Sequence, residues 1–282
     1  MEKFQLTAFL KILGIGAASG IVYTNNSLFV ISDNSGFLYQ YQLQSNHLSK
    51  HPLIENPSEN ILKKLKPDFE SITLKGNELH IFGSGSTRNR NKKIIFNLKN
   101  NSIQEYNLSE LYKSIKTSIS ISDDELNIEG AFYYNEDLHL LQRGNGANSK
   151  NGILKINGNF DDNNQSHTKP VEVQFQSVQL PKIKHIETSF TDAIVVENKI
   201  YFLACAEDTL STYDDGDILG SLIGCMDIAT FKIDFTHQIS NTHKFEGLTL
   251  YQKTETEIIF LLCEDNDSEN LESTIYKLVL EK

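Results

Sequence analysis

A short pattern recurs along the chain and constrains its fold more than any other feature. A glutamate followed by a small residue opens an apolar run in DFESITL (68–74), LNIEGAF (126–132) and KFEGLTL (244–250). Two further segments, ASGIVYT (18–24) and FTDAIVV (190–196), align with these three, so the repeat has five units. A fixed period of roughly 40 to 60 residues indicates a repeat architecture. The aligned positions, called the anchors, are Ser19, Glu70, Glu129, Asp192 and Glu246.

Each unit contains the same series of short strands. An apolar run follows the anchor, a polar turn such as TNNS or YNED comes next, and a second apolar run follows. Asn, Gly and Asp between β-rich runs are typical of hairpins. A polar loop then precedes a third strand, and the first four units contain a fourth. The segment 108–119 departs from this pattern and predicts a short helix with Ser109 as its N-cap.

The two ends of the chain complete each other. The fifth unit lacks a fourth strand, and the alternating segment 4–13 has no hairpin partner. A ring of sheets closes when the N-terminal strand completes the last sheet. We therefore predict an all-β fold, a five-bladed β-propeller closed by its N-terminal strand, with six blades as the alternative. The predicted single domain, 1–282, has blades at 17–60, 67–119, 127–182, 190–240 and 244–282, plus the closing strand 4–13.

The first 20 residues have a second interpretation, because an apolar stretch ending in small residues resembles a signal peptide. Lys11 interrupts that stretch, and apolar residues from Phe4 to Ile12 largely alternate with polar ones. This is the period of a half-buried strand. No apolar run reaches the roughly 18 residues that span a bilayer. The sequence predicts a soluble protein and leaves cytoplasm and periplasm open.

Charge and cysteine content limit the classes of ligand that the protein can bind. The chain has 26 Lys plus Arg against 37 Asp plus Glu, a formal net charge of -11. This charge repels nucleic-acid phosphates and anionic membranes but is compatible with a cationic ligand. The three cysteines, Cys205, Cys225 and Cys263, lack the spacing of a zinc site. Cys205 and Cys225 either pair across neighbouring strands or, as we favour, are buried free thiols.

The anchors predict a metal site. In a propeller the first strand of each blade lines the central channel, so the anchors converge at one mouth. Carboxylates crowded there repel each other, and burying them unpaired costs several kcal/mol. An all-oxygen set suits a hard cation, calcium first and magnesium second. The predicted ligands are Glu70, Glu129, Asp192 and Glu246. In the structural alternative, each acid accepts backbone N–H bonds from the next blade or pairs with Arg88, Arg90 or Arg143.

Polar loops between the second and third strands open on the same mouth. Candidate ligand-binding residues in these loops are Asp33, Asn34, Arg88, Arg143, Asn145, Glu207, Asp208, Glu264 and Asp265. Acids facing arginines could hold a small molecule or a peptide. Glu129 and His243 are the candidate general bases. The sequence contains no nucleophile motif, P-loop or dinucleotide fingerprint.

The cadence of these units resembles a known group of proteins. IEGAFYYNEDLHLLQRGN (128–145), the C-terminal unit from FEGLTL onward and the first unit are similar to the phytase-like and SdiA-regulated bacterial β-propellers. They resemble the gluconolactonase and regucalcin propellers more loosely. The resemblance implies a calcium-compatible mouth that uses Glu70, Glu129 and Glu246, and a phosphoesterase or lactonase activity. Ser19 and Asp192 depart from an unbroken glutamate pattern, and those families commonly have six blades.

The sequence is therefore compatible with three alternative functions. The favoured one is a propeller that binds a small ligand or partner at its acidic mouth through a calcium ion. The second is a metal-dependent hydrolase of phosphoesters or lactones. The third is a protein-interaction scaffold whose mouth acids are purely structural. The sequence leaves enzymatic activity and oligomeric state undecided.

Overall fold

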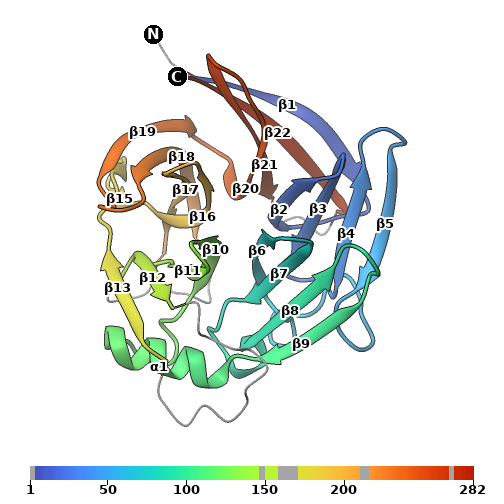
Figure 1. The fold of residues 1–282 in the computed structure, drawn as a ribbon, viewed down its shortest axis with the longest axis horizontal. Helices are drawn as coiled ribbons and strands as arrows, with labels where there is room; N and C mark the ends of the chain where they lie inside the picture. The colour runs from blue at the N-terminus through green and yellow to red at the C-terminus, as the bar shows by residue number, and fades with distance from the viewer. Residues whose placement is uncertain (1–3, 146–149, 158–170, 210–215, 267–269) are drawn as a thin grey trace.

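The chain folds into a five-bladed β-propeller, which confirms the fold predicted from the repeat (Figure 1). The structure is a computed structural model and describes residues 4–145, 150–157, 171–209, 216–266 and 270–282. These residues form five four-stranded antiparallel sheets and one short two-stranded sheet. Figure 1 looks down the axis around which the five sheets are arranged.

The strands of each sheet follow one another from the axis outward. The first sheet contains β2 (Ala18–Thr24), β3 (Ser27–Ser32), β4 (Phe37–Gln42) and β5 (His47–Pro52). The second contains β6 (Phe69–Lys75), β7 (Glu78–Gly83), β8 (Lys92–Asn97) and β9 (Ile103–Asn107). The third contains β10 (Ile128–Tyr134), β11 (Asp137–Gln142), β12 (Gly152–Ile156) and β13 (Val173–Ser177). The fourth contains β16 (Ser189–Val196), β17 (Lys199–Asp208), β18 (Asp217–Asp227) and β19 (Ile233–Ser240).

The fifth sheet is assembled from both ends of the sequence. It contains β20 (Lys244–Lys253), β21 (Glu257–Asp265), β22 (Glu272–Glu281) and β1 (Phe4–Leu13). β1 pairs antiparallel with β22, and Phe4 lies opposite Leu280. The prediction that the N-terminal strand completes the last blade is confirmed.

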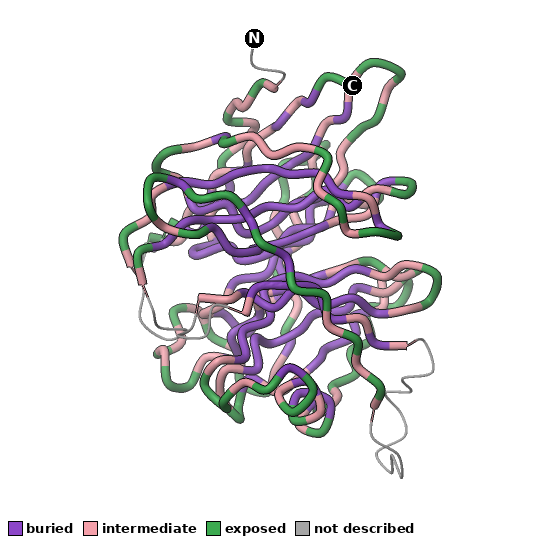
Figure 2. The backbone as a smooth tube through the Cα atoms, turned by 90° about the vertical axis from the view of Figure 1, so that its left-hand side faces the viewer, coloured by how far each residue is buried: buried purple, intermediate pink, exposed green. Residues whose placement is uncertain are grey.

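The innermost strands form a closed ring. β2 contacts β20 and β6, β10 contacts β6 and β16, and β16 contacts β20. Apolar side chains fill the space between neighbouring sheets, in five buried clusters that each join two adjacent sheets. Figure 2 shows these buried segments inside the molecule and the exposed segments along its loops. This packing holds the inner ends of the five sheets in fixed positions.

Outside the five four-stranded sheets, the described residues form three further short elements. They are the helix α1 (Ser109–Ile119), the 3-10 helix η1 (Arg88–Arg90) and the hairpin β14 (Lys182–Ile183) to β15 (Ile186–Glu187). α1 packs Leu111, Tyr112 and Ile115 into the cluster between the second and third sheets. The predicted helix is present, but Leu108 is its N-cap and Ser109 is its first residue. The Asn107 side chain accepts the Ser109 N–H at 2.8 Å and so supplies the capping bond.

The cysteines are buried free thiols, as we favoured from the sequence. Cys205, Cys225 and Cys263 form no disulfide. Cys205 lies opposite Ser221, whereas Cys225 lies opposite Tyr201, so the two are not neighbours across the β17–β18 pair. Within the described residues, no helix is both long enough and apolar enough to cross a membrane.

Candidate metal centre

Each innermost strand begins with a β-bulge at the same place. The pairing with the second strand slips by one residue, which leaves one bulge residue unpaired in every sheet. The five bulge residues are Ser19, Glu70, Glu129, Thr191 and Glu246. Four of the anchors therefore occupy equivalent positions. In the fourth sheet the equivalent residue is Thr191, and the anchor Asp192 lies one residue further along.

The residue after the bulge lies where neighbouring inner strands approach each other closely. A Cβ atom on Gly247 would lie 2.9 Å from the Cα of Gly20, and one on Gly130 would lie 3.0 Å from the Cα of Asp192. Small residues are therefore required at this position in most sheets. Asp192 is the exception, and its carboxylate accepts the N–H groups of Ala193 at 2.8 Å and of Leu248 at 2.7 Å.

The hydroxyl-bearing bulge residues tie one sheet to the next. Ser19 donates to the carbonyl of Phe69 at 2.5 Å, and Thr191 donates to the carbonyl of Phe245 at 2.7 Å. Both acceptors directly precede a bulge glutamate. These two contacts are structural, so the chemistry of the site depends on the three glutamates and the charged groups around them.

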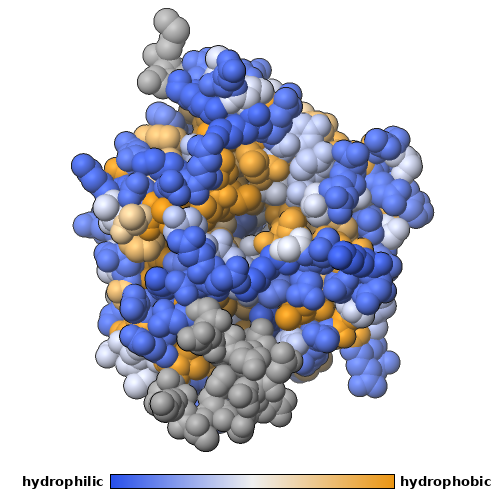
Figure 3. All heavy atoms as spheres, in the orientation of Figure 1, coloured by the Kyte–Doolittle hydropathy of each residue, from blue (hydrophilic) through white to orange (hydrophobic). Residues whose placement is uncertain are grey.

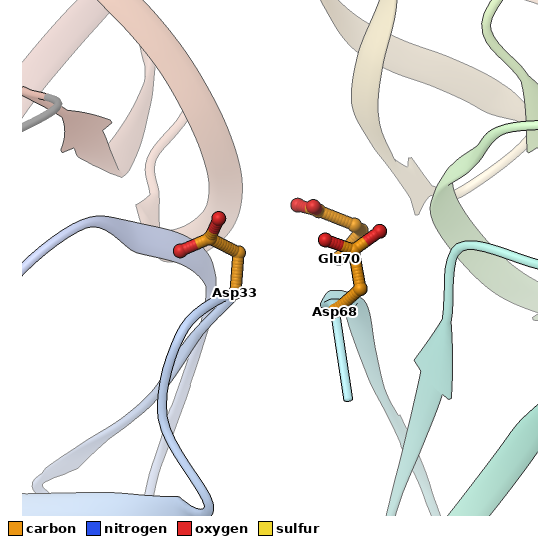
Figure 4. A group of neighbouring side chains, drawn as sticks. All are labelled: Asp33, Asp68 and Glu70. Atoms are coloured by element: carbon orange, nitrogen blue, oxygen red, sulfur yellow. The ribbon is translucent and has the colours of Figure 1, made fainter. Parts of the chain in front are cut away.

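Three carboxyl groups from two sheets meet at this end of the axis. Asp33 follows β3, Asp68 precedes β6 and Glu70 is the β6 bulge residue. One carboxylate oxygen of each lies within 4.8 Å of the others. Figure 4 shows Glu70 extended toward the loop that carries Asp33. Oxygens at this spacing could act together as ligands of one cation.

Glu70 is the least compensated member of this triad. In the part of the chain that the structure describes, no hydrogen bond or ion pair reaches its carboxylate. Burial raises the pKa of Glu70 well above its ordinary value, and the neighbouring carboxyl groups of Asp68, Glu129 and Glu246 raise it further. The side chain keeps partial contact with solvent. A cation that arrives from solution could therefore reach it.

Asp33 has one paired and one unpaired oxygen. Its Oδ2 atom pairs with the ammonium group of Lys66, while its buried Oδ1 atom has no hydrogen-bond partner among the described residues. Burial raises the pKa of Asp33 to about 6, against the lowering effect of Lys66. Lys66 also pairs with Asp68, at 2.8 Å between Nζ and Oδ1.

Asp68 is fully paired. Its Oδ2 atom accepts from Arg90 at 2.7 Å and from the hydroxyl of Ser84. Arg90 is buried and comes from η1, which lies between β7 and β8. Its guanidinium group also donates to the carbonyl of Lys63 at 3.1 Å. Asp68 is thus a potential oxygen ligand that Ser84 and Arg90 hold in place from the second sheet.

The third and fourth sheets share a buried ion-pair chain. Arg143 donates to Glu129 at 3.2 Å between Nη1 and Oε1, and it also pairs with Glu207. Asn127 donates to the same Glu129 oxygen at 2.6 Å. Burial alone would lower the pKa of Arg143, but Glu129 and Glu207 outweigh burial and hold that pKa well above its ordinary value. Arg143 therefore stays charged and committed to these two acids.

The fifth sheet repeats this arrangement with a lysine. Lys244 pairs with Glu246 at 2.8 Å and with Asp265 at 3.3 Å, and all three side chains are buried. Burial raises the pKa of Glu246 well above its ordinary value, and the carboxyl groups of Asp265 and Glu129 add to the effect against the opposing Lys244. One ammonium group thus serves two acids, and among the described residues of this region carboxyl groups outnumber cationic groups.

His243 and Glu264 form a separate pair next to this sheet. The Nδ1 atom of His243 lies 2.5 Å from Oε1 of Glu264, and the hydroxyl of Tyr276 donates to Oε2 of Glu264 at 3.0 Å. The imidazole ring packs against Phe245 and Tyr276. The carboxylate therefore orients a partly exposed imidazole whose second nitrogen is directed away from this contact.

The other predicted ligand-binding residues lie at the edge of this region. The Asn34 side chain accepts from Ser32 at 3.0 Å, and Asn145 accepts from Asn127 at 3.4 Å. Arg88 and Asp208 are exposed. The structure thus brings Asp33, Glu207 and Asp265 into the charged region with Arg143, and leaves Arg88 and Asp208 at the surface.

Three residues of this region were missed from the sequence: Lys66, Asp68 and Lys244. Asp68 and Lys244 lie two residues before a bulge glutamate, in DFE and KFE, and Asn127 has the same place in NIE. Comparison of that column between the units could have found them. Lys66 lies in the connection between the first two sheets, where the repeat offers no equivalent position.

The face seen in Figure 3 is hollowed near its centre, where the inner strands of Figure 1 converge. Hydrophobic side chains border this hollow, and hydrophilic ones cover most of the surrounding surface. The surface is therefore recessed where the propeller axis reaches this face.

Comparisons with known proteins give one family match and one informative likeness of fold. The model of DUF6929, described as a family of unknown function, matches residues 14–280. A glutaminyl cyclase from Myxococcus xanthus superposes with a TM-score of 0.54 at 11% identity, over 98% of this chain and 97% of that one. At this identity the likeness shows the fold alone.

Two other solved structures have TM-scores of 0.45, too low to carry an argument. One is a candidate exported protein from Bacteroides fragilis, at 11% identity over 99% of this chain and 96% of that one. The other is a candidate gluconolactonase, at 9% identity over 94% of this chain and 74% of that one. A search of curated proteins finds no match.

Proposed function

Because the chain belongs to DUF6929, a family of unknown function, we propose a function from its own site: the propeller binds a divalent cation at the carboxyl triad Asp33, Asp68 and Glu70. Calcium is the first candidate and magnesium the second, because the donors are all oxygen atoms. The observation that carries the proposal is the Glu70 carboxylate, which lies partly buried among other acids and receives no hydrogen bond or ion pair from any described residue.

The balance of charge favours a cation over an anion as the ligand. Arg143 and Lys244 are each committed to two carboxylates, and Arg90 is paired with Asp68. A phosphate or carboxylate ligand would have to separate one of these buried pairs, which would cost several kcal/mol. A divalent ion would instead relieve the repulsion among Glu70 and its neighbours.

The bulge glutamates and Asp192 differ in how available they are to the ion. Glu129 and Glu246 lie close enough to Glu70 to raise its pKa, so they would add to the attraction for a cation. Asp192 uses both oxygens for backbone N–H groups, which supports a structural role for it. We propose Glu129 and Glu246 as outer contributors. A small molecule or peptide could then bind through the ion, with Asn34 and Asn145 at the edge of the site.

Calcium titration by calorimetry on chelator-stripped protein, with thermal melting in parallel, tests the proposal. We expect micromolar binding and a raised melting temperature, since a ligand at a hundred times its Kd stabilises by about 2.7 kcal/mol. Glu70→Gln should weaken binding at least about tenfold, a loss of roughly 1.4 kcal/mol. Glu136→Gln, at an exposed turn position, is the matched control and should bind as the wild type does. No heat and no shift would make the acids structural and favour an interaction scaffold.

A second candidate function is a metal-dependent hydrolase of phosphoesters or lactones. The observation that favours it is His243, whose imidazole is oriented by Glu264 as a general base would be. A bound cation would polarise the ester and lower the pKa of a water molecule, and His243 would accept the proton from that water. A panel of phosphoesters and lactones, with calcium or magnesium, tests this function. Activity that His243→Gln removes while cation binding persists would support it, and no turnover on any member would exclude these two substrate classes.

A further inference from the structure

The ammonium group of Lys66 already occupies the position of a cation in the triad. It pairs with Asp33 and lies 2.8 Å from Oδ1 of Asp68, and the Lys66 side chain is 12% exposed. Burial lowers the pKa of Lys66, but Asp68, Asp33 and Glu70 outweigh burial and hold that pKa above its ordinary value. Lys66 therefore carries a full positive charge where two of the three proposed metal ligands meet.

An ammonium group satisfies this site only in part. Its single charge faces three carboxyl groups, and the Oδ1 atom of Asp33 stays without a hydrogen-bond partner in the described part of the chain. Glu70 receives no hydrogen bond from it. A divalent ion brings twice the charge and accepts six or more oxygen ligands, so it would engage the oxygens that Lys66 leaves unused.

We propose that Lys66 is a tethered counter-ion that the incoming divalent ion displaces, so that the segment 61–67 moves when the site is filled. The inference rests on the proposed cation-binding function. The two cations share oxygens of Asp33 and Asp68, and they repel each other at contact distance, so both cannot occupy the triad at once.

The segment 61–67 is built in a way that permits this movement. Besides the ion pairs of Lys66, its contacts with the neighbouring sheets include the Ile61 N–H to the Asn34 carbonyl at 2.8 Å, the Asn89 side chain to the Lys66 carbonyl at 2.9 Å, and Arg90 to the Lys63 carbonyl at 3.1 Å.

Leu62 and Leu65 contribute little to holding the segment in place, whereas Pro67 at its end is buried. Leu62 and Leu65 are 64% and 63% exposed, so they bury little apolar surface. A tight turn, in which Leu65 and Lys66 both donate to the Leu62 carbonyl, keeps the segment compact. The Lys66 side chain is long and can swing out into water without a change of fold.

Competition of this kind makes a direct prediction for affinity. Lys66→Met keeps the length and the apolar stem of the side chain but removes the charge. Calcium should then bind about tenfold more tightly or better, because no ammonium group has to be displaced. Lys66→Arg keeps the charge and should bind no more tightly than the wild type. Lys64→Met, at an exposed position in the same segment, is the matched control and should leave the Kd unchanged.

A chemical readout reports the displacement itself. Reductive methylation of the wild-type protein should modify Lys66 slowly in the absence of calcium, because its amine is held in two ion pairs. Saturating calcium should make Lys66 reactive, whereas exposed Lys64 should react equally in both conditions. Mass spectrometry of the digested protein measures each site separately.

The outcomes separate this inference from the proposed function. If neither the wild type nor Lys66→Met binds calcium or magnesium, both the function and the inference fail. If both bind with the same Kd and calcium leaves Lys66 protected, the function stands and the tethered counter-ion is wrong. Should Lys66→Met melt well below the wild type without metal, its melting temperature should recover with calcium by more than that of the wild type. Absence of that recovery would also overturn the inference.

Discussion

Asp192 of β16 accepts the backbone N–H of Leu248 of β20 at 2.7 Å and thereby joins the inner strands of the fourth and fifth sheets. Its other oxygen accepts the N–H of Ala193 at 2.8 Å, and the whole side chain is buried. The remaining sheets place a glycine or serine at this position, where strands approach closely. At this junction a carboxylate joins two neighbouring inner strands by hydrogen bonds. In the other sheets a small residue at this position lets the inner strands pack closely against each other.

Replacement of Asp192 by Ala should destabilise the fold. Two buried N–H groups would lose their acceptor, and each unsatisfied group costs about 1 to 3 kcal/mol. We expect the free energy of unfolding in urea to fall by roughly 2 kcal/mol or more. Asp192→Asn keeps one acceptor oxygen and should lose less, and Asp208→Ala, at an exposed position, should change nothing. Equal stability of the Ala variant and the wild type would contradict the role.

Glu70→Gln should stabilise the metal-free protein at pH 8. The substitution keeps the shape of the side chain but removes a charge that burial and neighbouring acids disfavour. A gain on the order of 1 kcal/mol in the free energy of unfolding is expected. Calcium should reverse the order by stabilising the wild type more than the variant. A metal-free variant that is less stable than the wild type would show that Glu70 has a structural role.

Arg143→Met should unfold the protein more readily than any surface change. It would leave Glu129 and Glu207 buried without their shared partner, at a cost of about 3 to 5 kcal/mol. The double variant Arg143→Met with Glu207→Gln removes one of the two unpaired carboxylates. It should recover part of the lost free energy of unfolding. Arg88→Met, at an exposed position of the neighbouring sheet, is the control and should stay within about 0.5 kcal/mol of the wild type. A small loss in the single variant would mean that water replaces the guanidinium.

Ile12 and Leu13 offer a matched test of the closing strand. They are adjacent in β1, but Ile12 is 1% exposed in the cluster between the fifth and first sheets and Leu13 is 70% exposed. Ile12→Ala should lower the free energy of unfolding by about 2 to 4 kcal/mol. Leu13→Ala should lower it by less than about 0.5 kcal/mol. If the two variants are equally stable in chemical denaturation, the closing strand contributes little to the ring.

Two buried histidines should make the protein sensitive to acid. Burial lowers the pKa of His80 to about 3 and of His139 to about 4. Below the ordinary histidine pKa the unfolded chain binds protons that the folded chain does not, so their contribution to stability falls as the pH decreases from about 6.5 toward 4. Each should lose roughly 1 to 2 kcal/mol by pH 5.

Glu70 and Glu246, whose pKa values are raised, add stability as the pH falls and so oppose the effect of the histidines. Comparison with histidine variants separates the two effects. His80→Gln and His139→Gln should each show a shallower decline of the unfolding free energy between pH 6.5 and pH 5 than the wild type. His47→Gln, at an exposed position, is the control. A decline that is unchanged in both variants would mean that the buried rings are protonated in the folded state.

The repeat predicted the fold because every unit repeats the same alternation and turn chemistry. Those local signals do not depend on which sheets become neighbours. The one misplaced anchor, Asp192, follows from a residue type: Thr191 holds the bulge position with a hydroxyl, and the acid beside it looks like the missing member of a glutamate series. Position within a bulge is a matter of strand pairing, which one unit alone does not reveal.

The site was less predictable than the fold because the side chains that form its ion pairs come from different sheets. The sequence placed Arg143, Glu129 and Glu207 near one mouth, but the pairing of one arginine with both acids depends on side-chain reach across a sheet boundary. Lys66 was beyond prediction for a similar reason. It lies in an irregular connection, where no periodicity indicates which way a side chain points.

The pairing of β1 with β22 also determines the order in which the molecule can be made. Residues 4–13 leave the ribosome before the other described strands, yet their partner in the sheet lies some 270 residues downstream, as Phe4 opposite Leu280 shows. A contact of such sequence separation is slow to form. Until it forms, β1 and β22 both present an unpaired edge. A chaperone that shields these two edges during synthesis should therefore raise the yield of folded protein, and a circular permutant that joins β22 directly to β1 should fold faster.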